Sequence, residues 1–347
     1  MALASHFEAF KGIKNRFPNL FFPSRSVMKI LPDSLVSDLC SIKEAIQLMK
    51  EAFRALSKRQ ALVPERIHLP VTDESLSLVM PVCDLETPRF GLKVVNLADR
   101  NPDRGLPRIH GTILLFDRKT GEPKSLMNAE KITALRTGAA VGMATDLLAP
   151  GNSSRLTLFG TGKQARSCAE AILAIRPIRQ VDVFSRNHDR GREFCQQLER
   201  EHAVDFRWTT DRNRIRESEI LCLATSSRSP LFEARCLPPR FHMNAIGSYR
   251  SDQQEFDPAI LSSTRIYVDQ VSTCKKEAGE IFLGLKNGDI HESDLHAIGD
   301  TLANPPPEEP AACTLFKSVG NAIQDLYVAN HVYQRSLEKG LGQKVRF

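Results

Sequence analysis

The chain has 347 residues, of which 41% are hydrophobic and 25% are charged, and its formal net charge at pH 7 is +6. That composition is typical of an ordinary soluble globular protein with room for two domains and a substantial core. The basic residues are scattered in short clusters with acids beside them, which argues against a nucleic-acid partner, and no apolar run reaches the length of a membrane span.

The 8 cysteines lie far apart and form no C-x-x-C pair, and no pair of histidines has metal-ligand spacing. Several of the cysteines fall within apolar segments, as buried free thiols do in a reducing compartment. The start of the chain lacks the apolar core of a secretory signal, and residues 1 to about 18 resemble a short extension more than a transit sequence. We therefore expect a cytoplasmic protein that binds no metal.

The first part of the chain is predicted to contain one long helix, several strands and a second helix. The apolar spacing over residues 33–58 predicts the first helix. Strand-like segments follow at 75–82, 90–97 and 111–117. The turn at 118–121 predicts a hairpin with the segment after it. A helix rich in small residues is predicted at 129–149, where its glycines and alanines would let another element approach closely.

The stretch from 155 to 175, RLTLFGTGKQARSCAEAILAI, has the order of a dinucleotide-binding βαβ unit. An apolar strand runs into a glycine turn, a helix follows, and a second strand is predicted at 181–186. Gly160 permits the tight turn, Gly162 lets the backbone approach a pyrophosphate, and Ala165 is the small residue where the helix packs on the strand. The phosphates would lie at the helix N-terminus, where free N–H groups favour anions.

The α/β alternation continues to about residue 300. Further strands are predicted at 219–225, 241–247 and 265–270, then a proline-rich linker at 304–310 and a long final helix at 314–339. Because the dinucleotide unit starts only at 155, an earlier domain must supply most of the substrate contacts, and the final helix is expected to pack back on it. We predict an α/β protein with a Rossmann-type domain at 131–314 and an α+β substrate domain at 1–130 and 315–347.

Three basic residues stand in apolar or small-residue surroundings: Arg66 in VPERIHLP, Lys93 in FGLKVVNL and Arg136 in ITALRTGAA. Lys93 interrupts a strand where an apolar residue is expected, and a buried lysine needs a partner. Together the three residues would form a cationic pocket whose two guanidinium groups suit a small carboxylate. The alternatives are a solvent-facing charge at a strand edge for Lys93 and a structural ion pair for Arg136.

The tip of the second strand carries Ser185, Arg186 and Asn187, at the place where a carboxylate would bind the ribose 2′-hydroxyl and indicate NAD. Asp182 comes too early, within the strand. A hydroxyl and a guanidinium suit a 2′-phosphate, so the sequence favours NADP(H) and keeps NAD(H) as an alternative. An ordinary surface charge is the other interpretation of Arg186.

Five motifs in this order resemble those of the ornithine cyclodeaminase/mu-crystallin family: GLKVV around Lys93, ITALRTGAA at 132–140, GTGKQA at 160–165, IGSYRSDQQEFDP at 246–258 and LFKSVGNAIQDL at 315–326. The resemblance covers about residues 20 to 345. It implies a homodimer in which the N-terminal domain both binds substrate and dimerises. By similarity, the catalytic and substrate-binding positions are Arg66, Lys93 and Arg136, with Tyr249 in the same pocket. The positions that match cofactor contacts are Thr112, Arg136, Gly160, Gly162, Lys163, Gln164, Ser185, Arg186, Asn187, Thr225, Gly247 and Ser318.

One departure from the family pattern bears on the reaction. Cyclodeaminases carry an Asp where Tyr249 stands, and tyrosine is a poor general base at neutral pH. Asp252 lies three places later and is no obvious replacement. This form of the motif is closer to the imine-reductase and crystallin branches of the family. Glu255 is interpreted as a residue that caps or braces a helix after this loop, and not as a catalyst.

The pocket and the resemblance together favour an NAD(P)H-dependent oxidoreductase that acts on the C=N or CH–NH group of small imino or amino acids. Arg66 and Arg136 would clamp the carboxylate, Lys93 would hydrogen-bond the substrate or relay a proton, and hydride would pass to the imine carbon. A cyclodeaminase or opine-forming synthase that uses bound NAD+ is the first alternative. A non-catalytic, crystallin-like binder of NADPH and a small ligand is the second.

Overall fold

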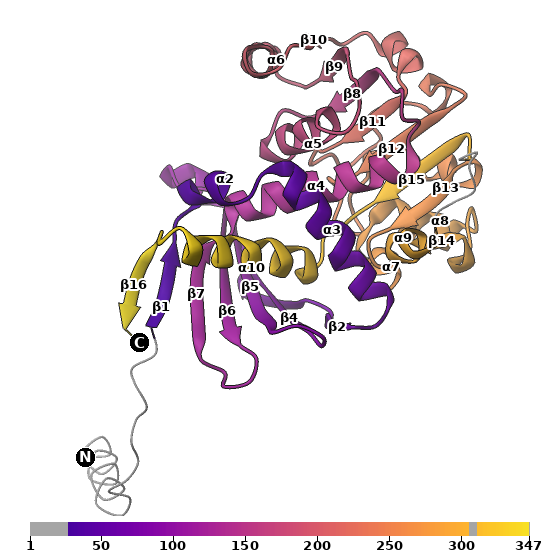
Figure 1. Cartoon of the computed structure of the whole chain (residues 1–347). Coiled ribbons are helices and arrows are strands. Elements are labelled where there is room, and N and C mark those ends of the chain that lie inside the picture. The colour runs from indigo at the N-terminus through magenta and orange to yellow at the C-terminus, as the bar shows by residue number, and fades with distance from the viewer. Residues whose placement is uncertain (1–26, 305–310, 347) are drawn as a thin grey trace, which may run out of the picture.

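The computed structural model describes residues 27–304 and 311–346, and two β-sheets with helices packed on them make up most of that part of the chain (Figure 1). The predicted N-terminal extension and most of the predicted linker lie outside these residues. The two sheets confirm the predicted fold class, a Rossmann-type unit combined with an α+β unit. No helix within the described ranges is long and apolar enough to cross a membrane.

The first sheet is built mainly from the early part of the chain. Its strands are β1 (Val27–Leu31), β2 (Ala61–Leu62), β3 (Ile67–Thr72), β4 (Ser75–Asp84), β5 (Arg89–Ala98), β6 (Ile109–Asp117), β7 (Pro123–Asn128) and β16 (Gln343–Arg346). Their order is β16-β1-β7-β6-β5-β4-β2, with β3 also paired to β4, and β4 to β7 form an antiparallel meander. Side chains alternate along these strands: Met80 and Ile113 are buried on one face, whereas Val94 and Leu114 on the other face are only half-buried.

Two long helices, α3 (Ile42–Ser57) and α10 (Ala322–Glu338), cover the buried face, and α10 lies across the strands with α3 beside it (Figure 1). The predicted helix at 33–58 is interrupted. A 3-10 turn and the short α2 (Val36–Leu39) come first, Cys40 takes an extended conformation, and α3 then begins after Ser41. The Ser41 hydroxyl accepts from the Glu44 N–H while the Glu44 carboxylate accepts from the Ser41 N–H, and this capping box starts a new helix.

The second sheet is entirely parallel. Its strands are β8 (Arg155–Phe159), β9 (Gln180–Phe184), β10 (Asp205–Trp208), β11 (Ile220–Leu223), β12 (Phe241–Ala245), β13 (Arg265–Val268), β14 (Leu295–Ala297) and β15 (Cys313–Lys317). The order is β10-β9-β8-β11-β12-β15-β13-β14. From β8 the chain first adds β9 and β10 on one side and then β11 and β12 on the other. The point between β8 and β11 where this order switches is where sheets of this kind bind dinucleotides.

The remaining helices belong to the second unit or join the two units. They are α4 (Glu130–Leu148), α5 (Lys163–Leu173), α6 (His188–Glu201), α7 (Val271–Glu277), α8 (Gly279–Asn287) and α9 (Ile298–Ala303). The small residues of α4 work as predicted. A Cβ at Gly138 would collide with Ser167 of α5, and a Cβ at Gly142 would lie 2.8 Å from Ile46 Cδ1 of α3. Both glycines therefore let α4 pack closely between the two units.

The predicted helix at 314–339 is wrong in its first part. Residues 313–317 form β15, a central strand of the second sheet, and α10 begins only at Ala322. Because a central parallel strand is buried on both faces, its apolar run has no alternation that would separate it from a buried helix. Gly320, with φ of +77°, lies in the turn between the two elements. The predicted domain boundary at 315 thus falls inside a strand of the second sheet, and the chain returns to the first unit after Lys317.

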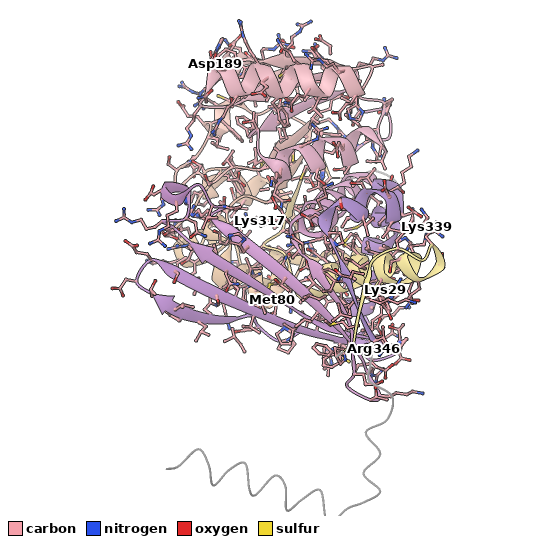
Figure 2. The ribbon with its side chains drawn as sticks, turned by 90° about the vertical axis from the view of Figure 1, so that its left-hand side faces the viewer. Lys29, Met80, Asp189, Lys317, Lys339 and Arg346 are labelled. Carbon is pink, nitrogen blue, oxygen red and sulfur yellow. The ribbon has the colours of Figure 1, made fainter. Side chains whose placement is uncertain are left out.

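The two ends of the described chain meet on the first sheet, where β1 pairs with β16. The buried ammonium of Lys29 donates to the carbonyls of Ser336 (2.9 Å) and Leu341 (2.7 Å), at the end of α10 where a cation is favourable. Figure 2 shows Lys29 and Arg346 at this end of the molecule, Asp189 on α6 at the opposite end, and Lys317 between them.

Candidate active site

A cavity of about 860 Å³ lies where the two sheets approach each other. One side is formed by the carboxyl ends of the second sheet's strands, with residues that follow β8, β9, β11, β12 and β15. The other side is formed by β4, β5 and β6 of the first sheet and by α4. This is the position in which open parallel sheets bind ligands, and here a second unit closes it.

The glycine turn after β8 has the geometry that a dinucleotide requires. Gly160 has φ of +110°, its N–H donates to the Phe184 carbonyl at 2.9 Å, and a Cβ there would lie 2.5 Å from the Ala224 carbonyl oxygen. Gly162 is the N-cap of α5, and a Cβ there would meet nothing within 4 Å. Open space in front of a helix N-terminus suits an anion, because the free N–H groups and the helix dipole there favour negative charge. The buried Oε1 of Gln164 has no partner among the described residues, which also fits a bound group.

The ribose end of the cavity is basic. Ser185 Oγ donates to the Asn187 carbonyl (2.7 Å) and accepts from Trp208 Nε1 (3.1 Å), so its position after β9 is well defined. Arg186 is exposed and lines the cavity, together with Arg190 and Arg212. Asp182 points elsewhere, because its carboxylate accepts from Arg214 Nε at 2.8 Å, in the 3-10 turn Arg212–Glu217. Glu130 is the single carboxylate among the described residues that line the cavity, and it pairs with Lys163.

The three predicted cationic residues come together at the other end of the cavity. Lys93 projects from β5, Arg136 from α4, and Arg66 from the segment before β3, and all three line it. Lys93 Nζ donates to Thr133 Oγ1 at 2.7 Å, and Arg136 donates to Gln324 Oε1. The alternative of a solvent-facing Lys93 is excluded, because only 4% of this residue is exposed.

Two carboxylates that the sequence interpretation did not single out balance these charges. Asp325 Oδ1 lies 2.9 Å from Lys93 Nζ and 3.2 Å from Arg136 Nε. Glu277 Oε2 lies 3.2 Å from Arg66 Nη2, and Arg66 also donates to the Gly320 carbonyl at 2.5 Å. The requirement that buried cations have counter-charges was a usable signal, but it did not say which of many acidic residues would meet it.

The electrostatic surroundings of Lys93 make it suitable for proton transfer. Burial lowers the pKa of its ammonium group from 10.5 to about 8, Asp325 acts against this change, and Arg136 and Arg66 act with it. A group whose pKa lies close to neutral pH both holds and releases a proton there, as a general acid or base must.

Buried acidic residues hold the loops around the cavity. Glu255 accepts from the N–H of Thr225 (2.7 Å) and of Gly247 (2.7 Å), and burial raises the pKa of its carboxyl group. Its role is bracing, as expected, although it braces the ends of β11 and β12 and not a following helix. Asp269 accepts from Ser318 Oγ (2.7 Å) and from the Gly320 N–H (2.7 Å), and it thereby fixes the turn against which Arg136 packs.

The structure brings every predicted site residue to the cavity except Thr112. The lining residues from the prediction are Arg66, Lys93, Arg136, Gly160, Gly162, Lys163, Gln164, Ser185, Arg186, Asn187, Thr225, Gly247, Tyr249 and Ser318. Thr112 lies on β6 between Gly111, which lines the cavity, and the buried Ile113. Since side chains alternate along a strand, the Thr112 side chain lies on the sheet's other face.

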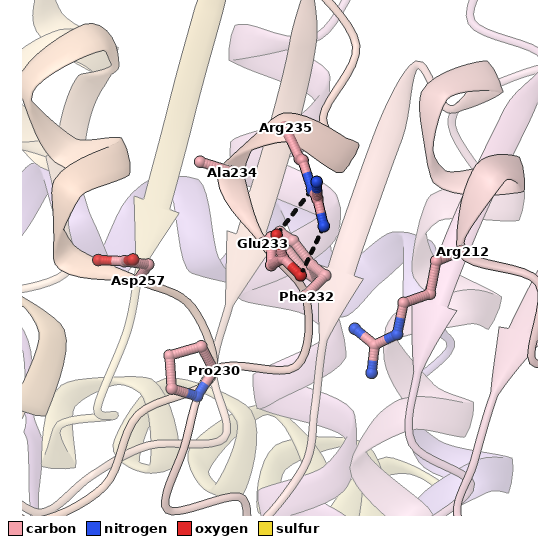
Figure 3. Close-up of a pocket in the computed structure, with 7 residues that line it drawn as sticks. All are labelled: Arg212, Pro230, Phe232, Glu233, Ala234, Arg235 and Asp257. Carbon is pink, nitrogen blue, oxygen red and sulfur yellow. Dashed lines mark hydrogen bonds and ion pairs between the residues drawn. The ribbon is translucent and has the colours of Figure 1, made fainter.

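A second cavity, of about 710 Å³, shares Arg212 with the first and is shown in Figure 3. Its charged groups already have partners: Arg235 Nε lies 2.7 Å from Glu233 Oε2, Arg212 donates to the Leu231 carbonyl, and Asp257 accepts from the Ala259 N–H. Elsewhere Glu170, Glu201 and His202 bring possible metal-ligand atoms within 4.8 Å of one another. Arg166 pairs with both of these carboxylates.

The fold and the first cavity define a dinucleotide-dependent enzyme, with three cationic side chains at one end of that cavity. The chain belongs to the ornithine cyclodeaminase/mu-crystallin family, whose model matches residues 27–340. The Delta(1)-pyrroline-2-carboxylate reductase of Bacillus cereus is 32% identical over 316 residues, which cover 89% of this chain and 97% of the relative.

Two solved structures agree with this assignment. The Delta(1)-pyrroline-2-carboxylate reductase of Thermococcus litoralis, in complex with NADH and L-proline, has a TM-score of 0.86 and 33% identity, covering 92% of this chain and 100% of that one. An archaeal alanine dehydrogenase dimer with bound NAD has a TM-score of 0.87 and 32% identity, covering 93% and 100%. The predicted family and the predicted class, an NAD(P)-dependent oxidoreductase, are confirmed, and a nicotinamide dinucleotide is its cofactor.

Proposed function

We propose that this chain reduces small imino acids by transferring hydride from NAD(P)H to the carbon of a C=N bond that lies next to a carboxylate. The observation that carries the proposal is the convergence of Arg66, Lys93 and Arg136 at one end of a cavity whose other end has the glycine turn. The similarity to two reductases of pyrroline-2-carboxylate, a cyclic imino acid, supports the same substrate class here.

The substrate carboxylate is bound by the two guanidinium groups. Arg136 is held by Asp325 and Gln324 from behind, and Arg66 by the Gly320 carbonyl and Glu277, so both groups are fixed before substrate arrives. A planar guanidinium binds a carboxylate with two parallel hydrogen bonds, which also orients the adjacent imine carbon.

The nicotinamide cofactor supplies the hydride when it is bound. The imine nitrogen must carry a proton for its carbon to accept hydride. Lys93, buried between Thr133 and Asp325, is the group that delivers or holds this proton. Gly162 and the N-terminus of α5 would hold the pyrophosphate, and Gln164 would complete that contact.

A cyclodeaminase remains the first alternative, and a binding protein without turnover the second. Tyr249 lines the cavity where cyclodeaminases carry an Asp, and its N–H donates to Gln253 Oε1 at 3.2 Å. With no carboxylate at that position, the step that draws a proton from the substrate amine lacks its usual base. This argues for reduction.

NADP(H) is the proposed cofactor form, with NAD(H) as the alternative. Ser185, Arg186 and Asn187 follow β9, and Arg190 and Arg212 add two further guanidinium groups to the same end of the cavity. A concentration of positive charge without a free carboxylate suits a 2′-phosphate.

We further propose that the protein is a cytoplasmic homodimer. We keep the two-domain division predicted from the sequence, but place the second domain boundary after Lys317 instead of at residue 315. Free thiols at all the cysteines support a reducing compartment. On the face of the first sheet that no described helix covers, Ile67, Leu69 and Val71 of β3 are exposed, and this face suits a second copy of the chain. The resemblance to an alanine dehydrogenase dimer supports this.

The decisive experiment is a panel of cyclic ketimines, 2-oxo acids with ammonia, and ornithine, each assayed with NADPH and with NADH. The proposal predicts that the absorbance of NADPH falls when pyrroline-2-carboxylate or piperideine-2-carboxylate is added. Release of ammonia from ornithine without net change in the cofactor would favour the cyclodeaminase. Saturable binding of imino acids without turnover would favour the binding protein.

A further inference from the structure

Asp325 occupies an unusual place among the charged groups of the cavity. Its Oδ1 lies within 3.2 Å of two cationic nitrogens, Lys93 Nζ and Arg136 Nε, and all three side chains are buried. The three residues come from β5, α4 and the first turn of α10, and 232 positions of sequence separate Lys93 from Asp325. A single carboxylate oxygen thus contacts both the proposed proton donor, Lys93, and the proposed carboxylate-binding residue, Arg136.

The contacts of Asp325 are not those of a helix cap. Its Oδ2 is buried and has no partner in the described part of the chain, and no backbone N–H donates to either oxygen there. The N-terminus of α10 still favours the negative charge. A buried carboxylate oxygen without a partner is unfavourable. The polar contacts that hold the Asp325 carboxylate in the described part of the chain are therefore those with the two cations, Lys93 and Arg136.

The three charged groups that act on Lys93 come from three separate segments of the chain. Arg136 lies on α4, Asp325 on α10, and Arg66 before β3, with Glu277 of α7 behind Arg66. Without Asp325, Lys93 would face two guanidinium groups in a buried site. Arginine does not lose its proton in proteins, so the lysine alone would give up its charge.

We infer that Asp325 is a positioning residue that keeps Lys93 protonated and directed toward the substrate, and so determines the pH range in which the enzyme delivers a proton. This inference rests on the proposed function, because it assigns Lys93 to proton delivery. Asp325 does not line the cavity, so we expect it to act on the substrate through Lys93 and Arg136.

The test is the pH profile of kcat/KM for imine reduction in Asp325→Asn. Reduction requires the protonated lysine, so activity is full below the pKa of Lys93 and falls as the pH rises through it. Removing a negative charge at hydrogen-bond distance lowers that pKa, and we expect the alkaline limb to move down by about 1 to 3 pH units. Well below the limb, kcat/KM should stay within roughly tenfold of wild type.

Two further variants keep the test independent of folding. Thr133→Val removes the other acceptor of the Lys93 ammonium and should move the limb in the same direction by a smaller amount. Lys93→Met should abolish the limb altogether. Binding of NADPH, followed by its fluorescence, reports whether each variant is folded.

The outcomes separate the two proposals. If wild type reduces no imino acid, the proposed function fails before any variant is compared. If wild type is active but Asp325→Asn loses activity equally at all pH values, with the alkaline limb unmoved, the inference about Asp325 is overturned. Where Asp325→Asn does not fold, the same result in Thr133→Val overturns it. A shifted limb that is absent in Lys93→Met supports it.

Discussion

Arg186 is the residue whose side chain bears most directly on cofactor choice. It is exposed at the edge of the cavity, where its guanidinium can meet a phosphate. A hydrogen-bonded charge pair of this kind contributes about 1.5 to 3 kcal/mol, so Arg186→Ala should raise the KM for NADPH by roughly 10- to 100-fold. The KM for NADH should change little.

The matched control is Arg192→Ala on α6, an exposed arginine that does not line the cavity. It should leave both KM values unchanged in steady-state assays. An equal loss of NADPH and NADH affinity in Arg186→Ala would mean that Arg186 does not read the 2′-phosphate.

His242 links single-residue chemistry to stability against acid. It is fully buried on β12, Nδ1 lies 2.9 Å from Thr314 Oγ1, and burial lowers its pKa from 6.5 to about 3. The folded protein therefore keeps this histidine neutral, while the unfolded chain takes up a proton below pH 6.5. Stability from this group is present above pH 6.5 and is lost as the pH falls toward 3.

The measurement is the free energy of unfolding in urea at several pH values between 7 and 4. Below pH 6.5, the free energy of unfolding of wild type should fall, relative to that of His242→Gln, by about 1.4 kcal/mol for each unit by which the pH is lowered. Two curves that run parallel across the range would show that His242 is not the group responsible.

At the scale of elements, close packing of α4 depends on residues without side chains. A Cβ at Gly138 would lie 2.6 Å from the Ser167 carbonyl carbon and would also meet Ser167 Oγ, so backbone would have to move. Overpacking of this kind costs about 1 to 3 kcal/mol, and Gly138→Ala should lower the free energy of unfolding by that amount in urea titrations.

Gly151 provides the matched control in the turn after α4. A Cβ there meets nothing within 4 Å, and its backbone is not in the left-handed region. Gly151→Ala should leave stability unchanged or raise it slightly, because the unfolded chain loses freedom. A similar effect of both substitutions would remove the close helix contact as the explanation for Gly138.

The elements themselves differ in how far local sequence predicts them. The antiparallel strands β4, β5 and β6 and the glycine turn before α5 were predicted within a few residues, because alternation and glycine position are local signals. The break at Ser41 and the strand β15 were missed. A capping box inside an apolar stripe and a strand buried on both faces both resemble continuous helix when only periodicity is considered.

At the scale of the whole molecule, no described helix covers the face of the first sheet that lies opposite α3 and α10. On that face Leu69 is 53% exposed and Val71 59% exposed, while α3 and α10 cover the opposite face. A second copy that packs there would bury these side chains. Leu69→Asp should then convert a dimer to a monomer, measured by light scattering during size-exclusion chromatography.

Leu337→Asp is the comparison, since this leucine is 46% exposed on α10, away from β3. It should leave the assembly unchanged. A dimer that persists in Leu69→Asp, or a wild-type monomer, would contradict the proposed interface.

Local patterns in the sequence determined the dinucleotide turn, the parallel order of the unit that contains it, and the presence of three cations in apolar surroundings, because these depend on residues close together in the chain. The tertiary structure decided which carboxylates meet those cations and which face Thr112 occupies. Lys93 reaches Asp325 only because α10 folds back across β5, and a contact between residues 232 positions apart leaves no periodic or spacing signal along the chain. Charge balance requires that a partner exist, but only packing selects it.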